Sequence, residues 1–481
     1  MNKKFKYLVL TAMVMSILTA CGGETAEVED TKIENVEQQE TTQSDNNTEI
    51  AQKDVETSQP VPEPEPEPVR DLGGLEIIQA EWSDTVEPEV KRSSQEEALW
   101  EYRNEMMDTH NFTYAQKALG TYSTLLELLS TSSLADDPAA QVFRIHANFI
   151  LAARDSGLLY DLATLDSIDL EDSKWSSSLI DTMTVGDSVY GVTKFGRPGR
   201  VIFFNKRLFE EAGLDPDLLY DLQASGEWTW DKFIELSELL TKDTDNDGVN
   251  DIYAINSHYG NFGSAAVFSN GGTFMDIDEN GNYFYDLKSP ESMEALEWAS
   301  NFWKTDLDLI PEHWDGHKQL FYSGKIAMYL GSEWECTTLG VDQMTDDWGM
   351  VAFPKGPQAD QYMAIYTDDA YIIPASYSKE EAEDIAFALD IWTNEAPEYD
   401  YEEAWMTALY PLYRDSRAVD ETMVLLRTPG IGQVDHSASI AGNIKKNLVV
   451  DQIGWGHMTP NESVENQEPL WQSELDKLNA K

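Results

Sequence analysis

The sequence predicts an α/β fold in which helices cover parallel sheets. Its 481 residues, with 41% hydrophobic and 11% aromatic content, can bury a large core spread over more than one domain or lobe. From residue 74 onward, short strand-like segments alternate with amphipathic helical segments. This alternation is typical of parallel sheets that are covered by helices.

The first elements of this pattern lie in the 90 or so residues after the start of the folded part. A β-branched, apolar segment predicts a strand, and apolar residues at helical spacing predict a helix. The helix that begins at 147 has Gly157 as its expected C-terminal stop. In chain order we expect a strand at 74–82, a helix at 94–107, a helix at 125–130, a strand at 138–145 and a helix at 147–162.

The chain begins with the pattern of a secretory signal. Three lysines precede an apolar run, residues 7–18, which is too short to span a membrane as a helix and ends in small residues. We therefore expect residues 1–20 to be a signal peptide and the rest of the chain to be exported.

The segment LTACG, residues 18–22, looks like the lipobox of bacterial lipoproteins. The resemblance implies cleavage before Cys21 and diacylation of this cysteine, which would anchor the protein to the extracytoplasmic face of the cell membrane. The alternative is a chance cysteine after an ordinary cleavage site. A lipidated Cys21 leaves Cys336 without a partner, so no structural disulfide is expected. Residues 21–71, rich in Glu, Thr, Gln and Pro, predict a disordered tether.

The charge of the chain excludes one class of partner. The sequence has 33 basic and 88 acidic side chains, for a formal net charge of -55. Nucleic-acid binding depends on Lys and Arg side chains that neutralise phosphates, so we expect no nucleic-acid partner.

Five stretches in the middle of the chain carry a family resemblance. They are SVYGVTKFGRPGRVIFFNKRLFEEAGLDPD (188–217), WTWDKFIELSELLTKDTDNDGVNDIYAI (228–255), FYSGKIAMYLGSEWE (321–335), WGMVAFPKGP (348–357) and DDAYIIPASYSKEEAEDIAFAL (368–389). In residues and in order they resemble the bacterial extracellular solute-binding proteins that serve carbohydrate ABC transporters (family 1, maltose-binding-protein-like). The residues before 188 and after 394 match the family only in general layout.

The resemblance implies a two-lobe periplasmic-binding-protein-like fold, with hinge crossovers and a central ligand cleft that closes on the ligand. It implies a monomer that captures a carbohydrate and delivers it to an ABC permease, and no enzymatic activity. Carried onto this chain, lobe one comprises residues 72–192 and 371–415. Lobe two comprises residues 193–370 and 416–481.

A loop rich in aspartate, TKDTDNDGVNDIYAI (241–255), matches most of an EF-hand calcium loop. Its expected ligands are the side chains of Asp243, Asp245, Asp247 and Asp251 and the carbonyl of Val249. Position twelve is an alanine and not the usual bidentate glutamate, so another acid would complete the site or the site would be weaker. The alternative is a solvated Asp-Gly turn after a helix.

The position of this loop suggests a structural Ca²⁺ ion. The helix expected at 230–240 and the strand-like segment 251–255 flank it directly, so the ion would clip a helix to a strand. A similar segment, DIDENGNYFYD (276–286), lacks the later ligands, and its Asn-Gly pair predicts a hairpin turn between two strands.

Candidate ligand-binding residues follow from sugar chemistry and from the resemblance. A sugar presents hydroxyl groups and an apolar face, so its site needs aromatic platforms flanked by Arg, amide and carboxylate groups. Each candidate also has an interpretation without ligand binding, because an aromatic residue after a strand is commonly part of the core and a lone Arg is commonly solvated. The candidates are Trp82, Asp84, Arg144, Trp334, Asp369 and Tyr371, with Ser83, His258, Tyr259 and Trp455 as further positions.

No catalytic motif emerges from the sequence. HWDGH, residues 313–317, has Trp where the zinc-protease pattern needs Glu, and neither a phosphate loop nor a nucleophile elbow is present. A lipid-anchored glycoside hydrolase or polysaccharide lyase is the main alternative, because hydrolysis needs only a pair of carboxylates and the chain has 88 acidic side chains. A sensory or adhesive lipoprotein is the other alternative.

Overall fold

The computed structural model describes residues 69–480, except for 122, 177–178, 181–182, 195–196, 311–315, 340–343, 367–368, 402, 429 and 441–443. The chain separates into two units, 1–66 and 67–481, and the second holds all the described residues. The expected signal peptide, Cys21 and nearly all of the tether lie outside the described residues.

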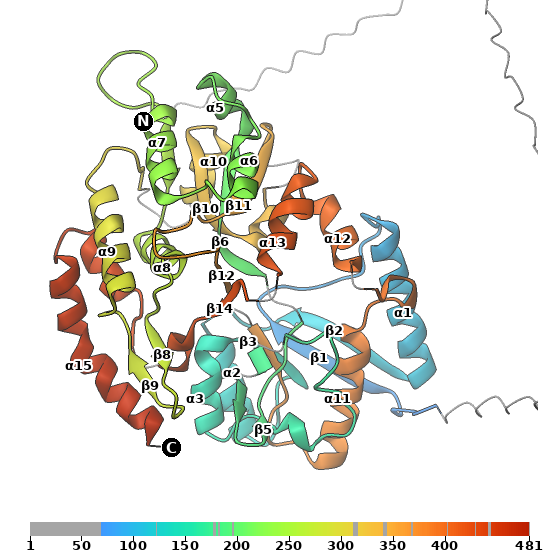
Figure 1. The fold of residues 1–481 in the computed structure, drawn as a ribbon. Helices are drawn as coiled ribbons and strands as arrows, with labels where there is room; N and C mark the ends of the chain where they lie inside the picture. Colours follow the sequence, from blue (N-terminus) through green and yellow to red (C-terminus); the bar gives the residue numbers. More distant parts are fainter. Residues whose placement is uncertain are drawn as a thin grey trace, which may run out of the picture. The chain divides into compact units, whose positions relative to one another are not determined.

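The first sheet has four strands in the order β13-β3-β1-β2 (Figure 1). Strands β1, β2 and β3 run parallel, as expected for strands joined by helical crossovers, while β13 is antiparallel to β3. The bounds are β1 (Leu75–Glu81), β2 (Phe112–Ala118), β3 (Val142–His146) and β13 (Asp369–Ile372).

Helices cover both faces of this sheet (Figure 1). Because side chains alternate along a strand, Val142 lies in the apolar cluster that contains Trp100 of α1 and Leu389 of α11. The next residue of β3, Phe143, packs instead with Leu129 of α2. The covering helices are α1 (Ser94–His110), α2 (Leu125–Leu134), α3 (Ala147–Asp155) and α11 (Lys379–Thr393).

The second sheet has six strands in the order β14-β12-β6-β10-β7, with β11 also paired to β6. Strand β6 is antiparallel to β10, β11 and β12, whereas β10 and β7 run parallel, as do β12 and β14. The bounds are β6 (Pro198–Asn205), β7 (Tyr253–Asn256), β10 (Ile326–Ser332), β11 (Trp348–Ala352), β12 (Ala364–Tyr366) and β14 (Gly432–Val434).

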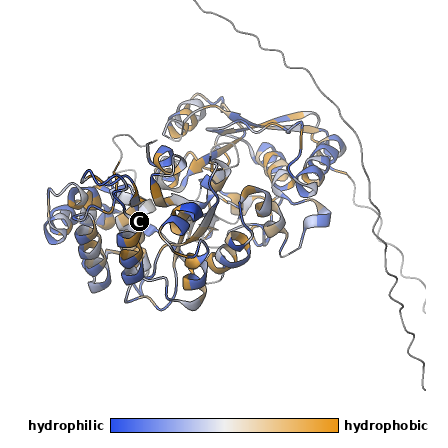
Figure 2. Cartoon of the chain, turned by 90° about the horizontal axis from the view of Figure 1, so that it is seen from above, coloured by the Kyte–Doolittle hydropathy of each residue, from blue (hydrophilic) through white to orange (hydrophobic). Residues whose placement is uncertain are grey.

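The second sheet is packed in one large apolar cluster. Phe203, Trp228, Trp348 and Trp471 are among its fully buried side chains. Hydrophilic and hydrophobic residues mix along the helices, as expected for helices with one face in the core (Figure 2). The helices of this part are α5 (Lys206–Glu211), α6 (Leu218–Ser225), α7 (Trp230–Leu240), α8 (Tyr259–Ser269), α9 (Pro290–Phe302), α10 (Gly316–Tyr322), α14 (Leu448–Gly454) and α15 (Pro460–Asn479).

Short elements complete the described chain. Among them β8 and β9 form an antiparallel hairpin, which confirms the hairpin predicted for 276–286. The bounds are β4 (Thr184–Val185), β5 (Ser188–Val189), β8 (Met275–Ile277), β9 (Tyr283–Tyr285), α12 (Ala404–Leu409), α13 (Val424–Leu426), a π-helix η5 (Ala418–Met423), and 3-10 helices η1 (Leu162–Thr164), η2 (Glu333–Thr337), η3 (Pro397–Tyr399), η4 (Tyr410–Leu412) and η6 (His436–Ile440).

The predicted α/β class is confirmed, and the sheets differ from the prediction in one respect. Both are mixed rather than purely parallel, because β13 and β6 run against their neighbours. Gly157 follows α3 with φ 69°, as expected of a glycine that ends a helix. Within the described part of the chain, no helix combines the length and apolar character needed to cross a bilayer.

Candidate ligand-binding site

The carboxyl ends of parallel strands in the first sheet bring several predicted residues together. Strand β1 ends at Glu81 and β3 ends at His146, and parallel strands end at the same edge of a sheet. The antiparallel strand β13 starts at this edge, so Asp369 pairs with His146 and Tyr371 pairs with Arg144.

Arg144 is the centre of this group. Its Nη1 lies 3.4 Å from Oε2 of Glu81 and its Nη2 lies 3.3 Å from Oδ2 of Asp369. The guanidinium carbon lies 5.4 Å from the ring centroid of Trp82 and 6.0 Å from that of Tyr371. Four of the six candidate residues, Trp82, Arg144, Asp369 and Tyr371, are therefore neighbours in the structure.

Glu81 was not among the candidates, although it is the most buried acid of the group, with a side chain 2% exposed. Its Oε2 accepts from Nε2 of Gln79 at 3.0 Å and its Oε1 accepts from Oγ of Ser83 at 2.8 Å. The hydroxyl of Tyr114 donates to Oε1 of Gln79 at 2.7 Å. This chain of hydrogen bonds holds the Glu81 carboxylate under Arg144. The sequence signal that could have identified Glu81 is an acidic residue at the end of a segment that predicts a buried strand.

The charges of this group change the pKa of Asp369. Burial raises the pKa of Asp369 to about 6, against the lowering effect of Arg144 and with a further rise from Glu81. Burial lowers the pKa of Arg144, but the charges of Tyr371, Asp369 and Glu81 outweigh it, so the guanidinium stays charged. The site thus holds a fixed cation beside a carboxylate that titrates near pH 6.

Asp84 has a different hydrogen-bond partner. Its Oδ1 accepts a hydrogen bond from the backbone N–H of Ala118 at 2.9 Å, which ties the chain after β1 to the end of β2. The Asp84 side chain is thus engaged in joining two strand ends.

Trp334 lies on η2, directly after β10, and 45% of its surface is exposed. Nζ of Lys318 lies 4.6 Å from the centroid of its ring and 3.0 Å from Oε2 of Glu335. The Tyr329 hydroxyl also donates to Oε2 of Glu335, at 2.7 Å. An exposed indole with a cation on its ring is a suitable platform for a sugar.

A second buried acid, Glu333, precedes Trp334. Its Oε1 accepts from the Tyr413 hydroxyl at 2.6 Å, and its Oε2 lies 3.5 Å from Nε of Arg197. The carboxylate is 1% exposed. Sequence reasoning missed Glu333, whose only signal was its place next to the candidate tryptophan.

Residues from the second sheet lie within electrostatic reach of the first. Asp435, just after β14, forms a hydrogen-bonded ion pair with Lys446. Burial lowers the pKa of His146 to about 4, and the charges of Lys446 and Arg200 lower it as well, while Asp435 raises it. Element η6 also contacts α3. His146, at the end of β3, therefore faces charged groups of the second sheet.

The cations of the candidate site do not outnumber its acids. Apart from Asp84, the described residues just considered include five cations and five anions. The cations are Arg144, Arg197, Arg200, Lys318 and Lys446, and the anions are Glu81, Glu333, Glu335, Asp369 and Asp435.

The three further positions in the second part of the chain lie at α8 and α14, two helices that contact each other. His258 is the N-cap residue of α8, with its ring 6.2 Å from that of His317. Tyr259 packs edge-on against Trp303 at 5.1 Å. Trp455, which follows α14, is 51% exposed.

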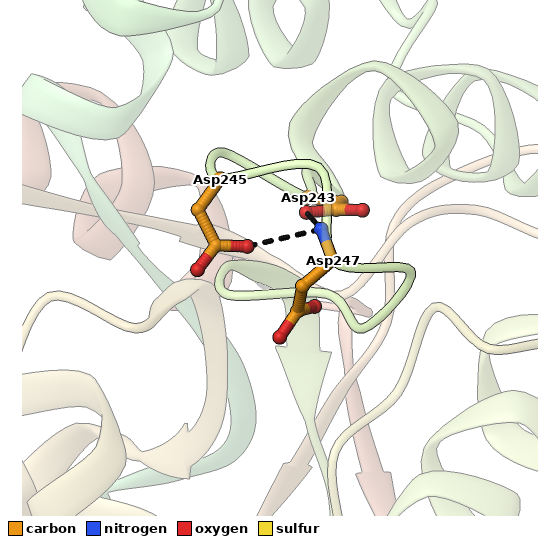
Figure 3. A group of neighbouring side chains, drawn as sticks. All are labelled: Asp243, Asp245 and Asp247. Carbon is orange, nitrogen blue, oxygen red and sulfur yellow. Dashed lines mark hydrogen bonds between the residues drawn. The ribbon is translucent and has the colours of Figure 1, made fainter.

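The aspartate loop brings together three of its five predicted ligands. One carboxylate oxygen from each of Asp243, Asp245 and Asp247 lies within 4.8 Å of the others (Figure 3). The backbone N–H of Asp247 donates to Oδ1 of Asp243 at 3.2 Å and to Oδ1 of Asp245 at 3.1 Å. Carboxylate oxygens grouped in this way can hold a hard cation.

The other two predicted ligands have different surroundings. Oδ2 of Asp251 accepts from both the N–H and the hydroxyl of Thr244, and these bonds lower the pKa of Asp251. Val249 donates its N–H to Oδ1 of Asp247 at 2.8 Å. Asp251 thus closes the loop onto Thr244.

Two mixed β-sheets, each covered by helices, form an α/β fold of the periplasmic-binding-protein class. The family model of the bacterial extracellular solute-binding proteins matches residues 112–392. Because this match covers more than half of the chain, the protein belongs to that family. Membership of this family identifies the protein as a solute-binding protein rather than an enzyme. No curated protein sequence gives a match.

Solved structures share the fold at low sequence identity. A cyclic α-maltosyl-1,6-maltose binding protein from Arthrobacter globiformis has a TM-score of 0.60 and 14% identity, covering 84% of this chain and 100% of its own. The sugar-binding protein MalE from Xanthomonas citri has a TM-score of 0.59 and 15% identity, covering 84% and 98%. An ABC transporter solute-binding protein from Thermotoga lettingae, bound with α-D-tagatose, has a TM-score of 0.58 and 16% identity, covering 84% and 100%.

Proposed function

We propose that this protein is a membrane-anchored substrate-binding protein that captures a sugar or oligosaccharide and delivers it to an ABC permease. The observation that carries the proposal is the arrangement around Arg144. One cation is held between two carboxylates and beside two aromatic rings, which offers hydrogen-bonding groups to hydroxyls and apolar faces to sugar rings.

The balance of charge supports a neutral ligand. A phosphate or carboxylate ligand needs an excess of cations, whereas the five cations of this site each have an acid within electrostatic reach. Neutral sugars match a site with many donors and acceptors and no excess of cations. The proteins from A. globiformis and X. citri are named as binding proteins for sugars, in agreement with this proposal.

The proposed ligand residues are Trp82, Arg144, Trp334, Asp369 and Tyr371, to which the structure leads us to add Glu81. Asp84 belongs to the same proposal as a residue at the edge of the site. Ligand contacts from both sheets would favour a closed state that the permease recognises, because a ligand shifts a conformational equilibrium by its difference in affinity for the two states.

The two lobes of this mechanism are residues 72–192 with 371–415, and residues 193–370 with 416–481. Apolar packing supports most of this division, but the apolar residues at 405–413, which it assigns to lobe one, pack in the cluster around the second sheet. The clusters around the first sheet contain residues from 72–192 and 370–392, and the cluster around the second contains residues from 201–365 and 413–475.

The test is a titration of the tryptophan fluorescence of the full chain, purified in detergent, with D-tagatose, maltose, maltotetraose and D-galacturonate. We expect a saturable change with a neutral sugar and none with the uronate, and chromatography should show the sugar unchanged. An Arg154→Gln control, on α3 and paired with Asp155, should bind as well as the unsubstituted protein. A response to none of the neutral sugars would contradict the proposal.

The aspartate loop is proposed to hold a structural Ca²⁺ ion. The oxygens of Asp243, Asp245 and Asp247 provide the hard donor set that Ca²⁺ prefers. The loop joins α7 to β7, and its two ends already meet through the N–H of Lys242, which donates to the carbonyl of Ile252 at 2.9 Å. A cation here would neutralise the three acids and hold the loop closed.

Chelation distinguishes this role from one in ligand binding. We expect a chelator to lower the melting temperature while sugar affinity, measured well below the melting temperature, stays the same. Asp245→Asn should reproduce the loss and remove the response to chelator, whereas Asp278→Asn, in the β8–β9 hairpin, should retain the response. A loss of affinity larger than the loss of stability would refute the structural role.

Lipid attachment at Cys21 is the last part of the proposal, and it rests on the lipobox. Membrane fractionation should place the protein with the membrane, and mass spectrometry of the N-terminal peptide should show acyl chains on Cys21. The Cys21→Ala variant should be released from the membrane, because alanine lacks the thiol to which the lipid anchor is attached.

A further inference from the structure

Arg200 occupies a β-bulge in β6, a central strand of the second sheet. In the ladder between β10 and β6, Gly331 pairs with Val201 and Ser332 pairs with Gly199, so Arg200 is the extra residue. On the other side of β6, the partner changes at the same point, because β11 ends its pairing at Val201 and β12 begins at Gly199. Arg200 is therefore outside both ladders.

The backbone of Arg200 is in the left-handed region, with φ 63°. In a bulge of this type, the residue in the left-handed conformation is normally glycine, because a side chain makes this backbone conformation unfavourable. Retaining arginine here costs stability, and bulges commonly redirect a side chain near a binding site.

The Arg200 guanidinium has one buried donor that is unused. Its Nε–H is buried and has no acceptor among the residues that the structure describes. A buried donor without a partner is costly, so a native protein that keeps one commonly supplies the acceptor in another state, such as the ligand-bound state. A bound ligand would therefore relieve the cost at Arg200.

The surroundings of Arg200 place this donor between the two sheets. Burial lowers the pKa of Arg200, while the negative charges of Asp435 and Glu335 raise it. Its own positive charge lowers the pKa of His146, at the end of β3, and that of His258, just after β7. Arg200 thus lies near residues of both sheets that belong to the candidate site.

We propose that Arg200 is a ligand-binding residue of this site and that its Nε–H donates to a hydroxyl oxygen of a neutral sugar. The inference rests on the proposed function. A hydroxyl is favoured over a carboxylate or phosphate because Asp435 and Glu335 already supply negative charge to the guanidinium. The bulge turns the arginine out of the ladders and toward the ligand.

Two variants separate this role from a structural one. Arg200→Gly removes the guanidinium and also the backbone strain, so it should keep or raise the melting temperature while it weakens sugar binding at least tenfold. Arg200→Lys keeps the charge but loses the planar donor group, so it should also weaken binding at least tenfold. Asp136→Gly is the matched control: Asp136 has φ 59° in an exposed loop after α2, so its change relieves strain without affecting affinity.

The full chain and the three variants are titrated with D-tagatose, maltose and maltotetraose, and their melting temperatures are measured. Loss of affinity in both Arg200 variants, without loss of stability in Arg200→Gly, supports the proposal. Undiminished affinity in either variant overturns the assignment of Arg200. A marked fall in the melting temperature of Arg200→Gly overturns it as well. Both results leave the proposed function intact. If the unsubstituted chain binds none of the three sugars, the proposed function fails, and the assignment of Arg200 fails with it.

Discussion

Replacing Asp369 by asparagine tests the electrostatics of the candidate site. The Asp369 carboxylate lies 3.3 Å from Nη2 of Arg144, and its side chain is 17% exposed. Burial raises the pKa of Asp369, Arg144 lowers it and Glu81 raises it, for a result of about 6. Asparagine has nearly the same shape and no charge, so Asp369→Asn removes the titration with little change in packing.

The structure gives the size of the effect. The difference between the ordinary pKa of 3.8 and about 6 corresponds to about 3 kcal/mol, at about 1.36 kcal/mol per pKa unit. Because the folded-state pKa is the higher one, the protonated carboxyl stabilises the folded protein fully below about pH 4, and this contribution is lost as the pH rises through about 6. As the pH rises from about 4 to about 6, the free energy of unfolding of the wild type should fall by up to about 3 kcal/mol relative to that of Asp369→Asn.

Urea unfolding followed by tryptophan fluorescence, from about pH 4 to about pH 7, measures this difference. Glu380→Gln is a suitable control, because Glu380 is exposed on α11 and its replacement should leave the pH dependence of the wild type unchanged. If the wild type and Asp369→Asn keep a constant difference in free energy of unfolding across this range, then the Asp369 carboxyl has an ordinary pKa and the electrostatic reasoning is wrong.

Three further substitutions separate binding from stability. Trp334→Ala should weaken sugar binding at least tenfold but change the free energy of unfolding by less than about 0.5 kcal/mol, because the side chain is 45% exposed; marked destabilisation in urea would show it to be a core residue. Trp348→Ala should cost about 3–5 kcal/mol in urea unfolding, since Trp348 is 1% exposed, and a cost under about 1 kcal/mol would contradict its place in the core. Arg144→Met should abolish sugar binding and cost roughly 3 kcal/mol, because it leaves the carboxylate of Glu81 buried without its cation; retained affinity in the titration would remove Arg144 from the site.

Arg144 shows why part of the site was predictable. Trp82 follows β1 and Arg144 stands near the end of β3, and the carboxyl ends of parallel strands meet at one edge of a sheet. A one-dimensional pattern of strands and helices therefore predicts that these two residues converge, and the Arg144 guanidinium carbon lies 5.4 Å from the Trp82 ring centroid. Asp369 instead begins β13, whose antiparallel pairing with β3 brings it to the same edge.

Glu81 and Arg200 show why the rest was not predictable. Glu81 reads as an ordinary polar residue of a strand, and its burial depends on the register that places β1 beside β3. Arg200 reads as one residue of the strand GRVIFFN, and its bulge exists only because β10 pairs with both Gly199 and Val201. Both features come from pairings between segments that are distant in the sequence.

By itself the sequence determined the α/β class, the principal strands and helices, and the solute-binding family, because these depend on local periodicity and on motifs that stand in a fixed order. The sequence also identified the aspartate loop, whose three acids are close in sequence and therefore close in space. Only the tertiary structure decided that the sheets are mixed, that Arg144 lies between two acids and that Arg200 is left outside the ladders. Strand order, direction and register are set by long-range packing and hydrogen bonding, which no local segment of the chain encodes.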